Sequence, residues 1–253
     1  MGTKRYLEDP KKRFSSRVEN YIKYRPNYPQ EIIDFLKEKG ILLKDSIIVD
    51  IGSGTGILSE MFLKEGNTVY GVEPNLDMRK AGEKLLEKYR NFTSIEGSAE
   101  STGLEDKSVD IIAVGQAFHW FNLEQAKMEF KRILRPEGTV IIVWNNRRKS
   151  GNTFSGDYEK LMRKYGTDYN LVRKSETKIE DFFIYKKKMF YNYQKLDHSG
   201  LKGRFLSASY IPLEKGPKFN EMIRELKKVF KENQKNGFII LEYDTEVNYG
   251  VLK

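Results

Sequence analysis

The stretch Val49-Asp50-Ile51-Gly52-Ser53-Gly54-Thr55-Gly56 decides the fold of this chain. It joins an apolar run at 46–51, which predicts a buried strand, to an amphipathic run at 55–65, which predicts a helix. Glycines at such a turn let the backbone bend sharply and approach a ligand, and the first turn of the helix offers unpaired N–H donors. Glu73 follows Gly52 by 21 positions, at the end of the next predicted strand, where an acid can bind ribose hydroxyls.

Three interpretations of this loop compete. A purely structural turn needs about one glycine, so three alternating glycines after a strand argue against it. A dinucleotide site has the pattern G-x-G-x-x-G, which requires glycine at position 57, where Ile57 stands. The third interpretation is the D-x-G-x-G-x-G loop of S-adenosylmethionine-binding proteins, and residues 50–56 match it.

The middle of the chain continues the alternation of short apolar runs with longer amphipathic ones. It predicts strands at 68–73, 92–96, 109–115 and 138–145 and helices at 75–89 and 122–134. The tail predicts strands at 187–196 and 237–248 and helices at 198–207 and 217–235. Continuous apolar strands separated by helices indicate a doubly wound α/β fold with a mainly parallel sheet, and the tail predicts a late antiparallel pair at its edge.

We therefore expect a single domain over 1–253. Its expected parts are an N-terminal helical cap (1–40), a cofactor-binding core (46–145), a substrate-covering insertion (146–186) and a C-terminal part of the sheet (187–253). The insertion carries Arg147, Arg148, Arg163 and Arg173, which would line a positive pocket mouth. An ordinary surface insertion is the alternative interpretation.

The composition excludes several classes of protein. The chain has no cysteine, so disulfides, thiolate nucleophiles and cysteine-based zinc sites are excluded. It carries a net charge of +9, which favours anionic partners but is equally typical of a lysine-rich surface. No apolar run approaches the length of a membrane helix and no signal sequence is visible, so we expect a soluble, cytoplasmic protein without a membrane partner.

Several stretches resemble the class I S-adenosylmethionine-dependent methyltransferases, and more narrowly their type 11 group. They are residues 49–56, Gly71-Val72-Glu73-Pro74 and Gly97-Ser98-Ala99-Glu100. Gln116-Ala117-Phe118-His119-Trp120-Phe121, the N-terminal Tyr24-Arg25-Pro26 with Tyr28-Pro29, and the tail stretch 201–212 are similar to the branch around trans-aconitate methyltransferase. The resemblance implies a Rossmann-like, seven-stranded, mostly parallel sheet with one antiparallel strand and helices on both faces. It also implies S-adenosylmethionine as the cofactor and S-adenosylhomocysteine as its product.

The resemblance implies a set of cofactor-binding residues. They are Tyr21, Arg25, Asp50, Gly52, Ser53, Gly54, Glu73, Pro74, Ala99, Glu100, Gln116, Ala117 and His119. In that scheme Gly52 and Gly54 line the methionine and ribose, Glu73 binds the ribose hydroxyls, and Asp50 fixes the loop and the amino group.

The adenine would lie near Pro74, Ala99 and Glu100, and the methionine beside Gln116, Ala117 and His119. Tyr21 and Arg25 would come from the N-terminal cap, where a guanidinium can hold the methionine carboxylate through paired hydrogen bonds.

The chemistry points to methyl transfer onto a small molecule, with a carboxylate or hydroxyl oxygen as acceptor. The cofactor carries the reactive group, so the protein mainly orients the reactants, and a base is needed only when the acceptor must lose a proton. His119, at the end of the fourth predicted strand, is the candidate base, because an imidazole exchanges protons near neutral pH. A packed ring or a hydrogen bond to the cofactor is the alternative role.

Other methyltransferase subclasses fit less well. The Asn/Asp-Pro-Pro-Tyr/Phe motif of amino-group methylation is replaced by residues 116–119, and no cluster of acidic and amide side chains predicts a metal. Two alternatives stay open: an RNA methyltransferase, suggested by the positive charge, and a non-catalytic protein that binds S-adenosylmethionine.

Overall fold

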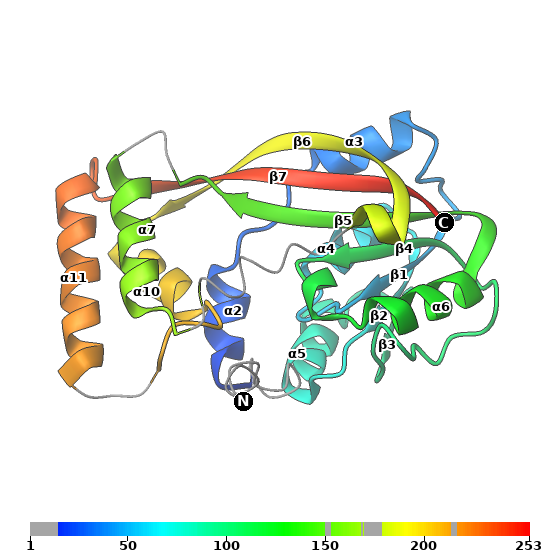
Figure 1. Cartoon of the computed structure of the whole chain (residues 1–253), viewed down its shortest axis with the longest axis horizontal. Coiled ribbons are helices and arrows are strands. Elements are labelled where there is room, and N and C mark those ends of the chain that lie inside the picture. Colours follow the sequence, from blue (N-terminus) through cyan, green and yellow to red (C-terminus); the bar gives the residue numbers. More distant parts are fainter. Residues whose placement is uncertain (1–14, 150–152, 168, 170–178, 214–216) are drawn as a thin grey trace.

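The computed structural model describes residues 15–149, 153–167, 169, 179–213 and 217–253 (Figure 1). Its strands are β1 (Ile47–Ile51), β2 (Thr68–Val72), β3 (Phe92–Ile95), β4 (Val109–Gly115), β5 (Leu134–Arg147), β6 (Phe183–Leu196) and β7 (Ile239–Leu252). Its helices in the first half are η1 (Ser15–Arg17), α2 (Val18–Tyr24), α3 (Glu31–Glu38), α4 (Ile57–Lys64), α5 (Leu76–Leu86), η2 (Phe118–Trp120) and α6 (Leu123–Ile133). The second half adds α7 (Thr153–Tyr165), α9 (Ile179–Phe182), α10 (His198–Leu206) and α11 (Pro217–Asn233).

The seven strands form one sheet in the order β3-β2-β1-β4-β5-β7-β6. The pairs from β3 to β5 are parallel, and β7 runs antiparallel to both of its neighbours, β5 and β6. The expected mostly parallel sheet with one antiparallel strand is thus confirmed. The strand order reverses between β1 and β4, and α/β sheets bind their ligands at such a reversal.

Buried apolar side chains cover both faces of this sheet. On one face α3 and α4 pack through Ile33, Leu36 and Phe62. On the other face α6 and α9 pack through Phe130 and Phe182, whose rings meet edge to face. The strands between these layers are buried on both sides, which explains their uninterrupted apolar sequences.

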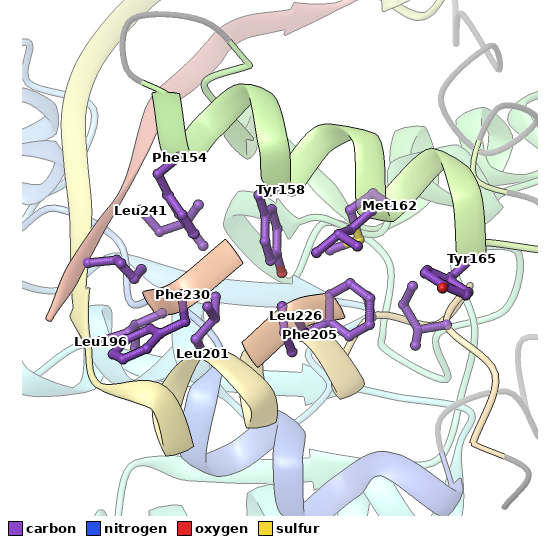
Figure 2. Packing of buried hydrophobic residues seen from close by; sticks show 14 of the residues in the cluster. Phe154, Tyr158, Met162, Tyr165, Leu196, Leu201, Phe205, Leu226, Phe230 and Leu241 are labelled. Carbon is purple, nitrogen blue, oxygen red and sulfur yellow. The ribbon is translucent and has the colours of Figure 1, made fainter. Parts of the chain in front are cut away.

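The last three strands differ from the others, because each is 14 residues long. Their extra length runs beyond the α/β core and carries α7, α10 and α11, as Figure 1 shows on its left side. These helices pack on each other and on β7 around a second core, which includes Tyr158, Phe205, Leu226 and Leu241 (Figure 2). We call this unit the helical annex.

The structure differs from the sequence prediction in the bounds of one strand and in the nature of the segment 146–186. The strand expected at 138–145 extends over Leu134–Arg147, because it continues through the irregularity where its pairing with β4 shifts register. The segment expected to be an insertion contains the end of β5, helices α7 and α9 and the start of β6, and Arg173 lies outside the described residues. Over the described ranges, no helix is long and apolar enough to cross a membrane.

Candidate functional site

The glycine loop after β1 has a backbone that only glycine adopts easily. Gly52, Gly54 and Gly56 have φ angles of 71°, 59° and 84°. A Cβ on Gly52 would lie 2.5 Å from the Cβ of Ala117, in the segment after β4. The loop therefore touches the chain on the other side of the strand-order reversal, and glycine at position 52 allows that approach.

Glu73 is tied to the same loop. Its buried carboxylate accepts hydrogen bonds from the backbone N–H of Gly54 at 2.9 Å and from that of Asn75 at 2.8 Å. Burial raises the pKa of Glu73, while these two hydrogen bonds act in the opposite direction. Each oxygen keeps a lone pair that can accept a further hydrogen bond.

Asp50 lies under the loop with half of its hydrogen-bonding capacity unused. Ser59 donates to its Oδ2 at 2.7 Å, whereas Oδ1 is buried and has no partner among the described residues. Burial raises the pKa of Asp50 to about 7. The hydroxyl of Thr55, which lines the same pocket, is also buried without a hydrogen-bond partner among the described residues. Two buried polar atoms at this pocket could therefore form hydrogen bonds with a ligand.

A pocket opens between the glycine loop and the N-terminal segment. It is lined by Tyr21, Tyr28, Asp50, Gly52, Ser53, Thr55, Ile57, Leu58 and Gly115. Tyr21, Asp50, Gly52 and Ser53 are among the residues predicted from the sequence, and Gly54 and Glu73 adjoin them.

Tyr28, Thr55, Ile57, Leu58 and Gly115 were missed as site residues. Signals for them exist in the sequence: Thr55, Ile57 and Leu58 belong to the loop and the first turn of the helix after it. Tyr28 lies in the proline-rich turn, which indicated a helix break rather than a pocket wall.

Arg25 reaches this region from the end of α2. Its guanidinium lies 4.6 Å from the ring centre of Tyr21, and its Nη2 donates to the carbonyl oxygen of Ser207 at 2.8 Å. Its Nε is buried without a partner among the described residues. Burial, and then the charge of Arg204, lower the pKa of Arg25.

Gly115, the last residue of β4, lines the pocket, and the segment that follows it adjoins the pocket. Gln116 has a φ of 61° and hydrogen-bonds through its side chain to Tyr28, whose pKa burial raises. The ring of His119 lies between two indoles, with ring centres 4.7 Å from Trp120 and 5.3 Å from Trp144. His119 is half-buried and does not line the pocket.

The residues predicted near an adenine lie beyond the pocket lining. Pro74 precedes Asn75, whose side chain caps α5 by accepting from the N–H of Met78. Ala99 is buried, and Glu100 accepts a hydrogen bond from the backbone N–H of Asn122 at 2.8 Å. The structure thus brings together the glycine loop, Glu73 and the N-terminal tyrosines at one pocket. Pro74, Ala99, Glu100 and His119 do not line that pocket.

Comparison with known proteins gives the family of the core. The family described as "Methyltransferase domain" matches residues 49–142, which span the glycine loop and strands β2 to β4 and end in β5. An uncharacterized methyltransferase of Schizosaccharomyces pombe is 28% identical over 227 residues, covering 87% of this chain and 89% of that protein. An uncharacterized methyltransferase of Mycobacterium tuberculosis is 36% identical over 134 residues, 53% of this chain and 52% of its own.

Solved structures share the fold. A candidate type II methyltransferase from Anaeromyxobacter dehalogenans superposes with a TM-score of 0.68 at 18% identity, covering 90% of this chain and 97% of the other. The matched family is broader than the trans-aconitate branch, which stays a prediction.

Proposed function

The chain belongs to the class I S-adenosylmethionine-dependent methyltransferases, and on this basis we propose that it methylates an oxygen atom of a small-molecule acceptor. Its methyl donor is S-adenosylmethionine, which becomes S-adenosylhomocysteine. The observation that carries the proposal is the pocket between the glycine loop and Tyr21 and Tyr28, because it joins the cofactor loop to a wall from outside the core.

The pocket residues fit the cofactor on grounds of chemistry. An amino acid end needs a carboxylate for its ammonium group, and Asp50 offers an unpartnered, buried Oδ1. A ribose needs an acceptor for its two hydroxyls, and both Glu73 oxygens have lone pairs left beside the loop. Gly52 and Gly54 have positive φ angles and carry no side chain, which leaves room for the cofactor beside the loop.

The remaining predicted contacts follow from these. Arg25 would hold the methionine carboxylate through its unpartnered Nε, because its Nη2 is already engaged by Ser207. Pro74, Ala99 and Glu100 would surround the adenine, and Ser53, Gln116 and Ala117 would complete the methionine side.

When bound, the cofactor supplies a methyl group on a sulfonium, which an in-line nucleophile accepts. The residues of this chain contribute orientation and exclusion of water, since Tyr21 and Tyr28 cover the loop. His119 would take the proton of a hydroxyl acceptor, and the indoles of Trp120 and Trp144 would fix its ring. A carboxylate acceptor needs no such base.

The residues of the pocket wall support a small acceptor over RNA. The pocket wall combines two tyrosines with the buried Asp50, and a folded RNA would have to extrude a base to reach it. The experiment below therefore tests RNA as the alternative methyl acceptor.

The test is thermal unfolding with S-adenosylhomocysteine, with NAD as a parallel control. A ligand at 100 times its Kd stabilises a fold by about 2.7 kcal/mol, so we expect a clear rise in Tm with S-adenosylhomocysteine alone. Labelled S-adenosylmethionine is then offered with small hydroxy acids, carboxylic acids and total RNA. Label transferred to RNA but to none of the small acids would refute the proposed acceptor class.

A further inference from the structure

Two guanidinium groups, that of half-buried Arg25 and that of buried Arg204, converge on one residue where the helical annex meets α2. Arg25 Nη2 donates to the carbonyl oxygen of Ser207 at 2.8 Å, and Arg204 Nη1 lies 3.4 Å from the Oγ of the same residue. Arg204 Nε also donates to the hydroxyl of Tyr243 at 3.1 Å. Arg204 is only 8% exposed, so its charge is held mainly by groups of the protein and not by solvent.

None of these groups is a carboxylate. Among the described residues, Arg25 and Arg204 form no ion pair, whereas the nearby Arg147 is paired with Glu159 at 2.6 Å. Burial acts to lower the pKa of Arg204, but Tyr243, Tyr158 and Tyr210 lie close enough to raise it above its ordinary value. Burying a charge without a counter-charge is strongly unfavourable, and here two like charges lie together. The ligand-free fold therefore lacks an anion at this position.

Tyr158 supplies a hydrogen-bond donor to the same place. Its side chain is fully buried, and its hydroxyl has no partner among the described residues. It projects from α7 toward Phe205 of α10, the residue next to Arg204 (Figure 2), and the two rings lie 5.8 Å apart. A buried hydroxyl that bonds to nothing is costly unless a ligand accepts from it.

The cofactor cannot supply a counter-charge to both guanidinium groups. S-adenosylmethionine carries only one carboxylate, which is the group proposed to bind Arg25, so Arg204 keeps no counter-charge. Arg25 stands against Tyr21, which lines the pocket, and Arg25 and Arg204 both contact Ser207. The unmatched charge of Arg204 is thus connected to the pocket through Arg25.

We propose that Arg204 and Tyr158 bind a carboxylate group of the methyl acceptor, with Arg25 between this group and the cofactor. The inference rests on the proposed function and narrows its acceptor to an acid. A guanidinium and a tyrosine hydroxyl match a carboxylate, which accepts two parallel N–H bonds and one O–H bond.

The experiment compares the wild type with R204Q, Y158F and the control R224Q. Arg224 is exposed on α11, so its substitution changes the net charge equally without touching the cluster. Thermal unfolding is followed with acetate, succinate and glutarate, with succinamide as the uncharged counterpart of succinate, and with inorganic phosphate. All samples have the same ionic strength, and each series is run with and without S-adenosylhomocysteine.

We expect at least one carboxylate, but not succinamide, to raise the Tm of the wild type and R224Q by several degrees. R204Q should lose at least half of that rise and Y158F part of it. The response of R204Q to S-adenosylhomocysteine should persist, because Arg204 is not in the cofactor pocket.

Three results would overturn the inference: an equal carboxylate response in R204Q, no carboxylate response in the wild type, or a response to phosphate alone. Failure of the proposed function has a different signature, which is the absence of any S-adenosylhomocysteine response in the wild type.

Discussion

The carboxylate of Glu73 accepts a hydrogen bond from the backbone N–H of Gly54, so the acid that ends β2 holds the loop that follows β1. The two residues come from neighbouring parallel strands, and the bond fixes the loop beside the acid. A cofactor hydroxyl at Glu73 would therefore meet an acceptor that is already held in place.

Replacing Glu73 with glutamine should weaken cofactor binding by tenfold to a hundredfold. Hydrogen bonds to a charged group contribute about 1.5–3 kcal/mol, and the amide keeps only one acceptor oxygen. Isothermal titration with S-adenosylhomocysteine measures the change. Glu96 is exposed and paired with Arg79, so E96Q is the matched control and should bind like the wild type. Equal affinities of E73Q and E96Q would remove Glu73 from the site.

The ligand-free protein should lose stability through Asp50 as pH rises. Burial raises the pKa of Asp50 from 3.8 to about 7, so between these values the folded chain holds a proton that the unfolded chain releases. The contribution of the neutral carboxyl is complete near pH 4 and is lost as pH passes 7. D50N cannot ionise, so its stability advantage over the wild type should grow between pH 5 and pH 8. Urea unfolding of both proteins at these two values measures the difference, and a constant difference would contradict the burial argument.

Gly52→Ala should destabilise the fold through two separable effects. One is the left-handed backbone, which costs a non-glycine residue about 1–2 kcal/mol, and the other is the 2.5 Å approach to Ala117. Gly40 has a similar φ of 67° with no atom near its Cβ position, so G40A reports the backbone effect alone. The urea midpoint of G52A should fall further than that of G40A, and A117G should restore part of the difference. Identical losses in G52A and G40A would mean that the contact carries no energy.

His119→Asn should lower kcat by about 10²- to 10⁴-fold once a hydroxyl acceptor is identified, because a general base contributes on that order. The same variant should flatten the acidic limb of the pH–rate profile. If His119 only packs between Trp120 and Trp144, the Tm and KM will change while kcat and its pH dependence stay as in the wild type.

Arg17→Met should loosen the helical annex. The Arg17 guanidinium donates to the carbonyl oxygens of Leu206, Ala208 and Ile211, and two of these bonds are fully buried. The carbonyl of Ala208 keeps the N–H of Ile211, whereas the carbonyl of Ile211 has no other donor among the described residues. Leaving one buried carbonyl unpaired costs about 1–3 kcal/mol, so the variant should lose at least that much in chemical unfolding. R90M, at an exposed arginine, is the control. Hydrogen exchange should increase in α10 and not in β4.

Much of the core could be predicted because its signals are local. Strand β4 occupies the predicted 109–115, since an apolar run between polar turns has few other solutions. The start of β5 was missed because Pro136 and Gly138 mark a break in the sequence, whereas the strand pairs on both sides of them with a shift in register. Glycine and proline punctuate local patterns, and tertiary pairing overrode them here.

The contacts around the annex could not be predicted. Arg25 was assigned from its sequence motif to a carboxylate, and the structure shows that one of its nitrogens is engaged by a carbonyl 182 positions away. Arg204 lies in the tail stretch 201–212 that carried part of the family resemblance, but no role was predicted for it, because the absence of a counter-charge around it depends on the packed chain. Such relationships depend on the packed chain and leave no periodicity in the sequence.

The hydrogen bonds from Arg17 to the carbonyls at and after the end of α10 also affect the order in which parts of the protein can fold during synthesis. The N-terminal segment emerges from the ribosome first, yet its anchoring carbonyls lie as many as 194 positions later. The glycine loop and its parallel strands can assemble while the tail is still being made. The wall that carries Tyr21 is held only after residue 211 has emerged, so the pocket proposed for the methyl donor is completed late in synthesis.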